Sequence, residues 1–222
     1  MIHLNDWFPI WLSLQVAFLS AALVSVTSLP LARLMASKSF RGRDFLEAAI
    51  MLPLVLPPSV VGYGLLVMIG VNGPLGKLLG QFGLSLVFTK IAVVIAATVV
   101  AFPLMYQSAR AAFASVNPNL EKAARTLGAG ELRIFFTVTL PLAWPGIMSG
   151  LVLAFARALG EFGATLMVAG NIPGQTQTIP LAIYFAVESG DSATASTLVA
   201  MITVFCFLLI FWVNRWNKKR LH

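Results

Sequence analysis

The sequence predicts an all-α membrane protein with about five transmembrane helices, built as a single domain over residues 1–222. Hydrophobic residues make up 59% of the chain, charged residues only 10%, and the mean hydropathy is +0.88. Soluble domains carry about 25% charged residues, so this chain cannot cover itself with a polar surface. Apolar stretches close to the roughly 20 residues that a spanning helix needs recur along it.

Five of these stretches are predicted spans: residues 10–35, 45–69, 86–109, 144–164 and 197–213. Residues 71–85, between the second and third spans, are rich in Gly and Pro and predict a short interfacial helix near 75–82. The fourth span carries two series of small residues at four-residue spacing, which favour close packing and a central position. The two series are Gly146, Gly150, Ala154 and Ala156, Gly160, Ala164.

The distribution of basic residues predicts the orientation of the chain. Twelve of the fifteen Lys and Arg residues fall in segments 33–43, 110–133 and 215–220. Basic loops stay in the cytoplasm, so we expect the N-terminus outside and the C-terminus inside. Residues 168–194 contain no Lys or Arg and are expected outside. A competing topology makes 168–187 a sixth span, but it would place the basic C-terminus outside.

Two features inside the predicted spans are candidates for a transport pathway or gate. Pro57 and Pro58, with Pro53, interrupt the second span and predict a kink, which either serves packing or shapes a pathway. Arg157 and Glu161 lie four residues apart in the fourth span and can pair on one helical face. Their pair either fixes helix packing or forms a gate. Gly163, which follows it, is either a hinge or a packing contact.

The longest stretch without a continuous hydrophobic run is residues 120–141, within a predicted cytoplasmic loop of about 115–141. Asn117 predicts a helix cap, Pro118 a first helical residue and Gly128 a left-handed end. A second short helix is expected over 131–136. The first helix has a small apolar face that suits the grip of another protein, although an ordinary interfacial helix is the alternative. This face comprises Leu120, Ala123, Ala124 and Leu127.

The same stretch resembles the EAA loop of ABC importer permeases. Its pattern is Glu121, Ala123, Ala124 and Gly128, followed after nine residues by Val138, Leu140 and Pro141. One extra residue separates the Glu from the first Ala, and Val stands where Ile is usual. Four further stretches resemble molybdate permeases in particular, with sulfate and tungstate permeases as near neighbours. They are residues 53–58, 123–130, 157–164 and 171–180.

The resemblance implies a type I ABC importer permease in the cytoplasmic (inner) membrane of a bacterium or archaeon. It implies a homodimer, two cytoplasmic ATPase subunits that use ATP, and an external oxyanion-binding protein that selects molybdate. It also implies that this chain binds no cofactor itself. The two histidines, His3 and His222, are terminal and isolated, so no metal site is expected, and the basic residues flank apolar segments rather than forming a nucleic-acid site. By the resemblance, Glu121, Ala123, Ala124, Gly128, Leu140 and Pro141 couple to the ATPase. Glu121 is expected to be partly exposed near the start of the helix, where it could also meet a basic residue of the ATPase.

No catalytic machinery is evident in the sequence. Gly76 and Lys77 are followed by Leu78, so the phosphate-binding GxxxxGK[ST] pattern is absent. The two histidines are terminal, and the single cysteine, Cys206, lies in an apolar run. The chain is therefore expected not to be an enzyme. A gradient-driven secondary transporter or channel is the main alternative in another class, and a membrane scaffold without transport is a third.

Overall fold

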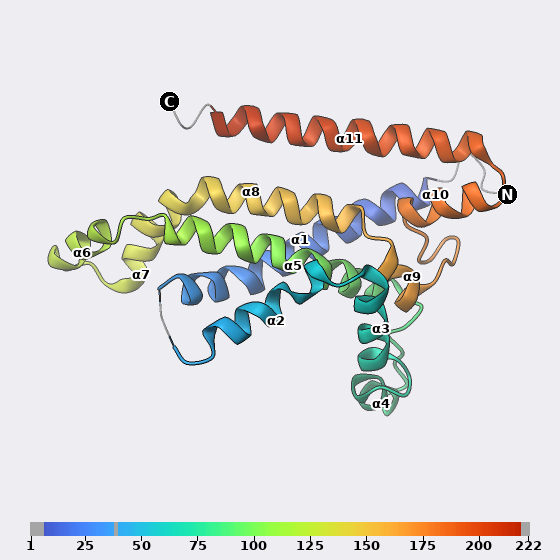
Figure 1. Ribbon diagram of the computed structural model, residues 1–222, viewed down its shortest axis with the longest axis horizontal. Coiled ribbons are helices and arrows are strands. Elements are labelled where there is room, and N and C mark those ends of the chain that lie inside the picture. Colours follow the sequence, from blue (N-terminus) through green and yellow to red (C-terminus); the bar gives the residue numbers. More distant parts are fainter. Residues whose placement is uncertain (1–6, 38–39, 219–222) are drawn as a thin grey trace.

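The computed structural model describes residues 7–37 and 40–218, and every regular element in these ranges is a helix (Figure 1). The basic residues Lys38, Lys219 and Arg220, the terminal histidines and residues 1–6 lie outside this description. The elements are α1 (Phe8–Ser37), α2 (Arg43–Val55), α3 (Pro58–Ile69), α4 (Pro74–Gly80), α5 (Lys90–Ala114), α6 (Pro118–Thr126), α7 (Glu131–Ile134), the π-helix η1 (Phe135–Thr139), α8 (Leu140–Leu159), α9 (Gly163–Ala169), α10 (Ile179–Glu188) and α11 (Ser192–Lys218).

The core is the contact of α5 with α1 on one side and α8 on the other. These three helices run along the length of the molecule in Figure 1. Gly146 and Gly150 of α8 lie directly against α5. A Cβ on Gly146 would lie 2.7 Å from the Cβ of Ala112, and a Cβ on Gly150 would lie 2.6 Å from the Cβ of Ser108. The close packing predicted for the first series of small residues is therefore confirmed.

The second predicted span is two helices rather than one kinked helix. α2 and α3 meet at a bend of 114°. Pro53 lies inside α2 without ending it, whereas Leu56 and Pro57 are both extended, with ψ of 145° and 138°. Each of these residues precedes a proline, and a residue before proline avoids the helical region. Within residues 7–37 and 40–218, four helices are long and apolar enough to span a membrane, or five if α2 and α3 form one broken span.

The fourth predicted span has wrong boundaries at both ends. Its helix starts at Glu131, because α7, η1 and α8 run on continuously to Leu159. The predicted short helix over 131–136 is thus the beginning of this long helix. At the other end the helix stops before Gly160, so Ala164 belongs to the separate helix α9. The second series of small residues is therefore split between two elements.

The remaining elements agree more closely with prediction. α4 is the expected short helix, and α5 starts at Lys90 because the Thr89 side chain accepts a hydrogen bond from the Ala92 N–H, 3.3 Å away. Pro103 lies within α5, which continues through it. Residues 168–187 form the end of α9, a loop and the ten-residue α10, so the alternative sixth span does not form. α11 packs on α10 and the edge of α8.

Candidate functional site

Helix α6 is built by local signals and lies with α7 at one end of the molecule (Figure 1). The Asn117 Oδ1 atom accepts a hydrogen bond from the Asn119 N–H at 3.0 Å, and Pro118 is the first helical residue. Gly128 has φ +81°, a left-handed conformation that glycine adopts without steric cost. The predicted cap, start and end of this helix are all confirmed.

The apolar face of α6 is uncovered in the single chain. α6 buries none of its residues; Ala123 is exposed, Ala124 is half-buried, and the Leu127 side chain just beyond the helix is 88% exposed. This face lies outside the helices long enough to span a membrane. An exposed apolar face in such a position suits a protein partner.

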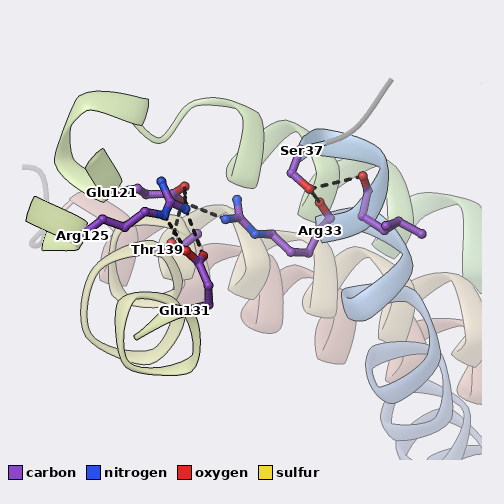
Figure 2. A network of polar contacts seen from close by, with 7 residues as sticks. Arg33, Ser37, Glu121, Arg125, Glu131 and Thr139 are labelled. Carbon is purple, nitrogen blue, oxygen red and sulfur yellow. Dashed lines mark hydrogen bonds and ion pairs between the residues drawn. The ribbon is translucent and has the colours of Figure 1, made fainter. Parts of the chain in front are cut away.

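Glu121 points the other way, into the chain, and its side chain is only 13% exposed. Its Oε1 atom accepts hydrogen bonds from Arg33 Nη2 at 2.9 Å and from Thr139 Oγ1 at 2.6 Å (Figure 2). Donors from α1 and η1 therefore already bond one oxygen of this carboxylate within the chain, and its contact with a basic residue of a partner stays a prediction. Sequence reasoning missed both donors, which lie 88 and 18 positions away.

A second ion pair joins α6 to α7. Arg125 donates to both carboxylate oxygens of Glu131, with 2.9 Å between Arg125 Nη2 and Glu131 Oε2. This hydrogen bonding raises the pKa of Arg125 above its usual value, so the guanidinium stays charged. Arg125 Nη2 also lies 3.9 Å from Glu121 Oε2, which connects the two pairs. The ion pair thereby holds α6 and α7 together across the short loop at Gly128, in addition to the left-handed conformation of the glycine.

Leu140 and Pro141 begin helix α8, in the same long helix as η1. Leu140 is half-buried and lines an apolar hollow of about 600 Å³ together with Arg33 and Phe113. Pro141 is exposed. The two residues thus belong to the long helix that enters the bundle, and not to α6, which carries the exposed apolar face.

Two of the pathway candidates meet where α3 crosses α9. A Cβ on Gly163 would lie 2.7 Å from the Cβ of Pro58, and a Cβ on Gly62 would lie 2.8 Å from the Cα of Ala164. Pro57 caps the start of α3 at the bend. The glycines let the two backbones come into direct contact, so a movement of α9 would displace α3.

The predicted pair of Arg157 and Glu161 forms, with 2.8 Å between Arg157 Nη2 and Glu161 Oε2. Glu161 lies in the break between α8 and α9, however, and not on a continuous helix. Its other oxygen, Oε1, accepts a hydrogen bond from the Ala164 N–H at 2.8 Å. Glu161 is 2% exposed and Arg157 28%, so this carboxylate fastens the end of α8 to the first turn of α9. Among the described residues, no group of three His, Cys, Asp or Glu side chains is placed to hold a metal.

One part of the molecule carries the exposed apolar face of α6, and another carries the close crossing of α3 and α9. The family model described as "binding-protein-dependent transport system inner membrane component" matches residues 28–222. The chain belongs to this family. Membership in it does not support the gradient-driven carrier or the scaffold considered above, because the family consists of components of binding-protein-dependent systems.

Curated members of the family are similar to this chain over nearly its whole length. The molybdenum transport system permease protein ModB of Escherichia coli (strain K12) is 44% identical over 220 residues, covering 97% of this chain and 96% of that protein. ModB of Haemophilus influenzae is 44% identical over 211 residues, covering 95% and 92%. A probable sulfate transport system permease protein of Chlorella vulgaris is 37% identical, covering 91% and 76%.

Solved structures of ABC transporters share the fold of this chain. A chain of the MetNI methionine ABC transporter, in an inward-facing conformation, superposes with a TM-score of 0.74 at 18% identity, covering 99% of both chains. The predicted fold class, an all-α permease of the ABC importer type, is therefore confirmed.

Proposed function

We propose that this chain is the permease subunit of an ABC importer that moves molybdate into the cytoplasm. The observation that carries the proposal is the 44% identity, over almost the full length, to permeases named for molybdenum transport. The exposed apolar face of α6 supports it, because an importer permease needs a surface on which an ATPase can act.

The proposed assembly has two copies of the permease, two cytoplasmic ATPase subunits and an external oxyanion-binding protein. ATP is bound and hydrolysed by the ATPase, and this chain carries no cofactor. The clusters of Lys and Arg support an orientation with α6 and the C-terminus in the cytoplasm and residues 170–178 outside. The binding protein selects the anion, and the permease lets it pass.

The structure suggests how motion would pass through the permease. ATP-driven closure of the ATPases would displace α6, which is followed by one continuous helix of 29 residues made of α7, η1 and α8. At about 1.5 Å per residue this helix reaches roughly 40 Å. Its far end carries the Arg157–Glu161 pair, which fastens α9, and α9 touches α3. A displacement at the docking face would thus arrive at the broken second span.

Sulfate is the second candidate substrate, favoured by the 37% identity to a probable sulfate permease of Chlorella vulgaris, and tungstate is a further alternative. All three anions are tetrahedral dianions, so a permeation path that accepts one is open to the others. Their discrimination is expected in the binding protein.

The test is uptake into proteoliposomes that contain the permease, its ATPase and the binding protein encoded beside it. We expect ATP-dependent uptake of molybdate, competed by tungstate more strongly than by sulfate. A preference for sulfate would transfer the assignment to the second candidate. Uptake that proceeds without the ATPase, driven by a proton or sodium gradient, would overturn the importer function.

A further inference from the structure

Helix α6 has no hydrophobic anchor of its own, so polar contacts must fix its position. It buries no residue: Leu120 and Ala123 are exposed, and Ala124 is only half-buried. The Glu121 carboxylate is the group that ties it to distant parts of the chain, through Arg33 at the end of α1 and Thr139 at the end of η1. Figure 2 shows the Arg33 side chain reaching across to Glu121 from the end of α1.

Both donors are themselves held in place. Arg33 Cζ lies 6.0 Å from the centre of the Phe113 ring of α5, and this ring lies 6.1 Å from that of Phe135 in η1. Thr139 is fully buried. It lies at the last position of the π-helix, whose extra residue per turn rotates the following side chains relative to an α-helix. The π-turn therefore sets the direction of the Thr139 hydroxyl.

We propose that Arg33 and Thr139 are positioning residues that hold the coupling helix in register with α1 and α8 through Glu121. This proposal rests on the proposed function for its transport consequence. A push on α6 then moves α1 and the long helix together, instead of tilting α6 alone. Because Glu121 faces the bundle, loss of the contact affects transmission of the movement and not the docking face.

The prediction distinguishes coupling from docking. A hydrogen bond to a charged group is strong enough to change a two-state population by about tenfold or more. We expect Thr139→Val and Arg33→Ala to lower the number of oxyanions moved per ATP hydrolysed by at least about threefold. Co-purification of the ATPase is expected to remain within about twofold of the unchanged permease.

Thr137→Val is the matched control. Thr137 lies in the same π-turn, but it is exposed and its hydroxyl bonds to its own helix at Arg133 O, 2.6 Å away. We expect this variant to transport with an unchanged stoichiometry. An equal effect of Thr137→Val and Thr139→Val would overturn the proposal, as would variants that lose transport only because the ATPase no longer co-purifies.

A distance measurement tests the positioning itself, whatever the transported substrate. Spin labels are attached through Ser37→Cys on α1 and Asn119→Cys on α6, both exposed sites, in a Cys206→Ser background. We expect one narrow distance distribution in the otherwise unchanged protein and with Thr137→Val, and a broadened one with Thr139→Val or Arg33→Ala. Distance distributions that stay narrow in both Thr139→Val and Arg33→Ala would overturn the positioning role, whatever the transport activity of these variants. Absence of molybdate uptake alongside the expected broadening would instead contradict only the proposed function.

Discussion

Gly163 and Pro58 touch across the crossing of α9 and α3, where a Cβ on the glycine would lie 2.7 Å from the proline Cβ. Two residues that the sequence indicated separately, one as a hinge or packing glycine and one as a helix breaker, form a single contact. The contact connects the broken second span to the carboxylate of Glu161 through the first turn of α9.

Enlarging this glycine should therefore destabilise the crossing. Gly163→Ala inserts a methyl group where proline leaves no room, and overpacking of this kind costs about 1–3 kcal/mol. The measurement is thermal unfolding of the purified permease in detergent. Gly64→Ala is the control, because its Cβ would meet nothing within 4 Å. Equal unfolding temperatures for the two variants would show that α3 and α9 do not pack as described.

The Arg157–Glu161 pair should show energetic coupling. Arg157→Ala leaves a carboxylate that is 2% exposed without its cation. A cost of about 2 kcal/mol is expected, below the roughly 3–5 kcal/mol of a fully buried pair because Arg157 is partly exposed. The double change to Ala at both positions should cost less than the sum of the single changes. Strict additivity in the double-mutant cycle would mean that the two residues do not interact.

The docking face of α6 should be sensitive to volume. Ala123→Leu changes an exposed side chain, so we expect normal insertion and folding of the permease. Overpacking of about 1–3 kcal/mol in a tight cleft weakens ATPase association by roughly ten- to a hundredfold. Binding is measured by co-purification and titration, with the small Ala123→Ser as the control. Gly128→Leu should instead distort the end of α6 itself, because any L-residue is strained at φ +81°. Undiminished association of Ala123→Leu would contradict the coupling assignment.

The start of α11 should weaken in acid. Hydrogen bonds from the hydroxyl and the backbone N–H of Thr194 lower the pKa of Asp191, so its carboxylate stabilises the folded state when ionised. This stabilisation is complete above the unfolded pKa of about 3.9 and is lost as the pH falls through the folded value. Thermal unfolding between pH 7 and pH 3 should show this loss. Asp191→Asn should reduce the dependence while keeping an N-cap, with the remainder due to other carboxylates such as Glu131, whose pKa is also lowered. An identical pH profile for Asp191→Asn would contradict the role of the carboxylate.

Topology has its own test. A single cysteine introduced by Gln175→Cys, in a Cys206→Ser background, should react with a membrane-impermeant reagent added outside intact cells. A reporter fused after Arg220 should report the cytoplasm. Labelling of position 175 only after the membrane is permeabilised would overturn the proposed orientation.

Local chemistry explains which parts of the structure were predictable. The cap at Asn117 and the left-handed Gly128 depend on a few neighbouring residues, and both are found where expected. The break between Leu159 and Gly163 was missed, because small residues at Gly160 and Ala164 continue the helical spacing of α8. What ends that helix is the fold around Glu161, which pairs with Arg157 and caps α9.

The polar network around Glu121 could not be read from neighbouring residues. Arg33 lies 88 positions away and reads as a flanking cation at the end of the first apolar segment. Thr139 is one of two threonines in an otherwise apolar run and is not distinguished from Thr137 by the sequence. Its role depends on the π-turn from Phe135 to Thr139, and hydrophobic spacing does not distinguish such a turn from an α-helix.

The seam where α5 meets α8 has a thermodynamic consequence. Gly146 and Gly150 lie there against Ala112 and Ser108. Gly and Ala have no side-chain rotamers to lose, so the contact of Gly146 with Ala112 costs almost no side-chain entropy. Neither of these two residues can change rotamer when the helices move. A displacement of one helix at this contact therefore moves the other helix with it, because no side chain between them can rearrange to absorb the movement.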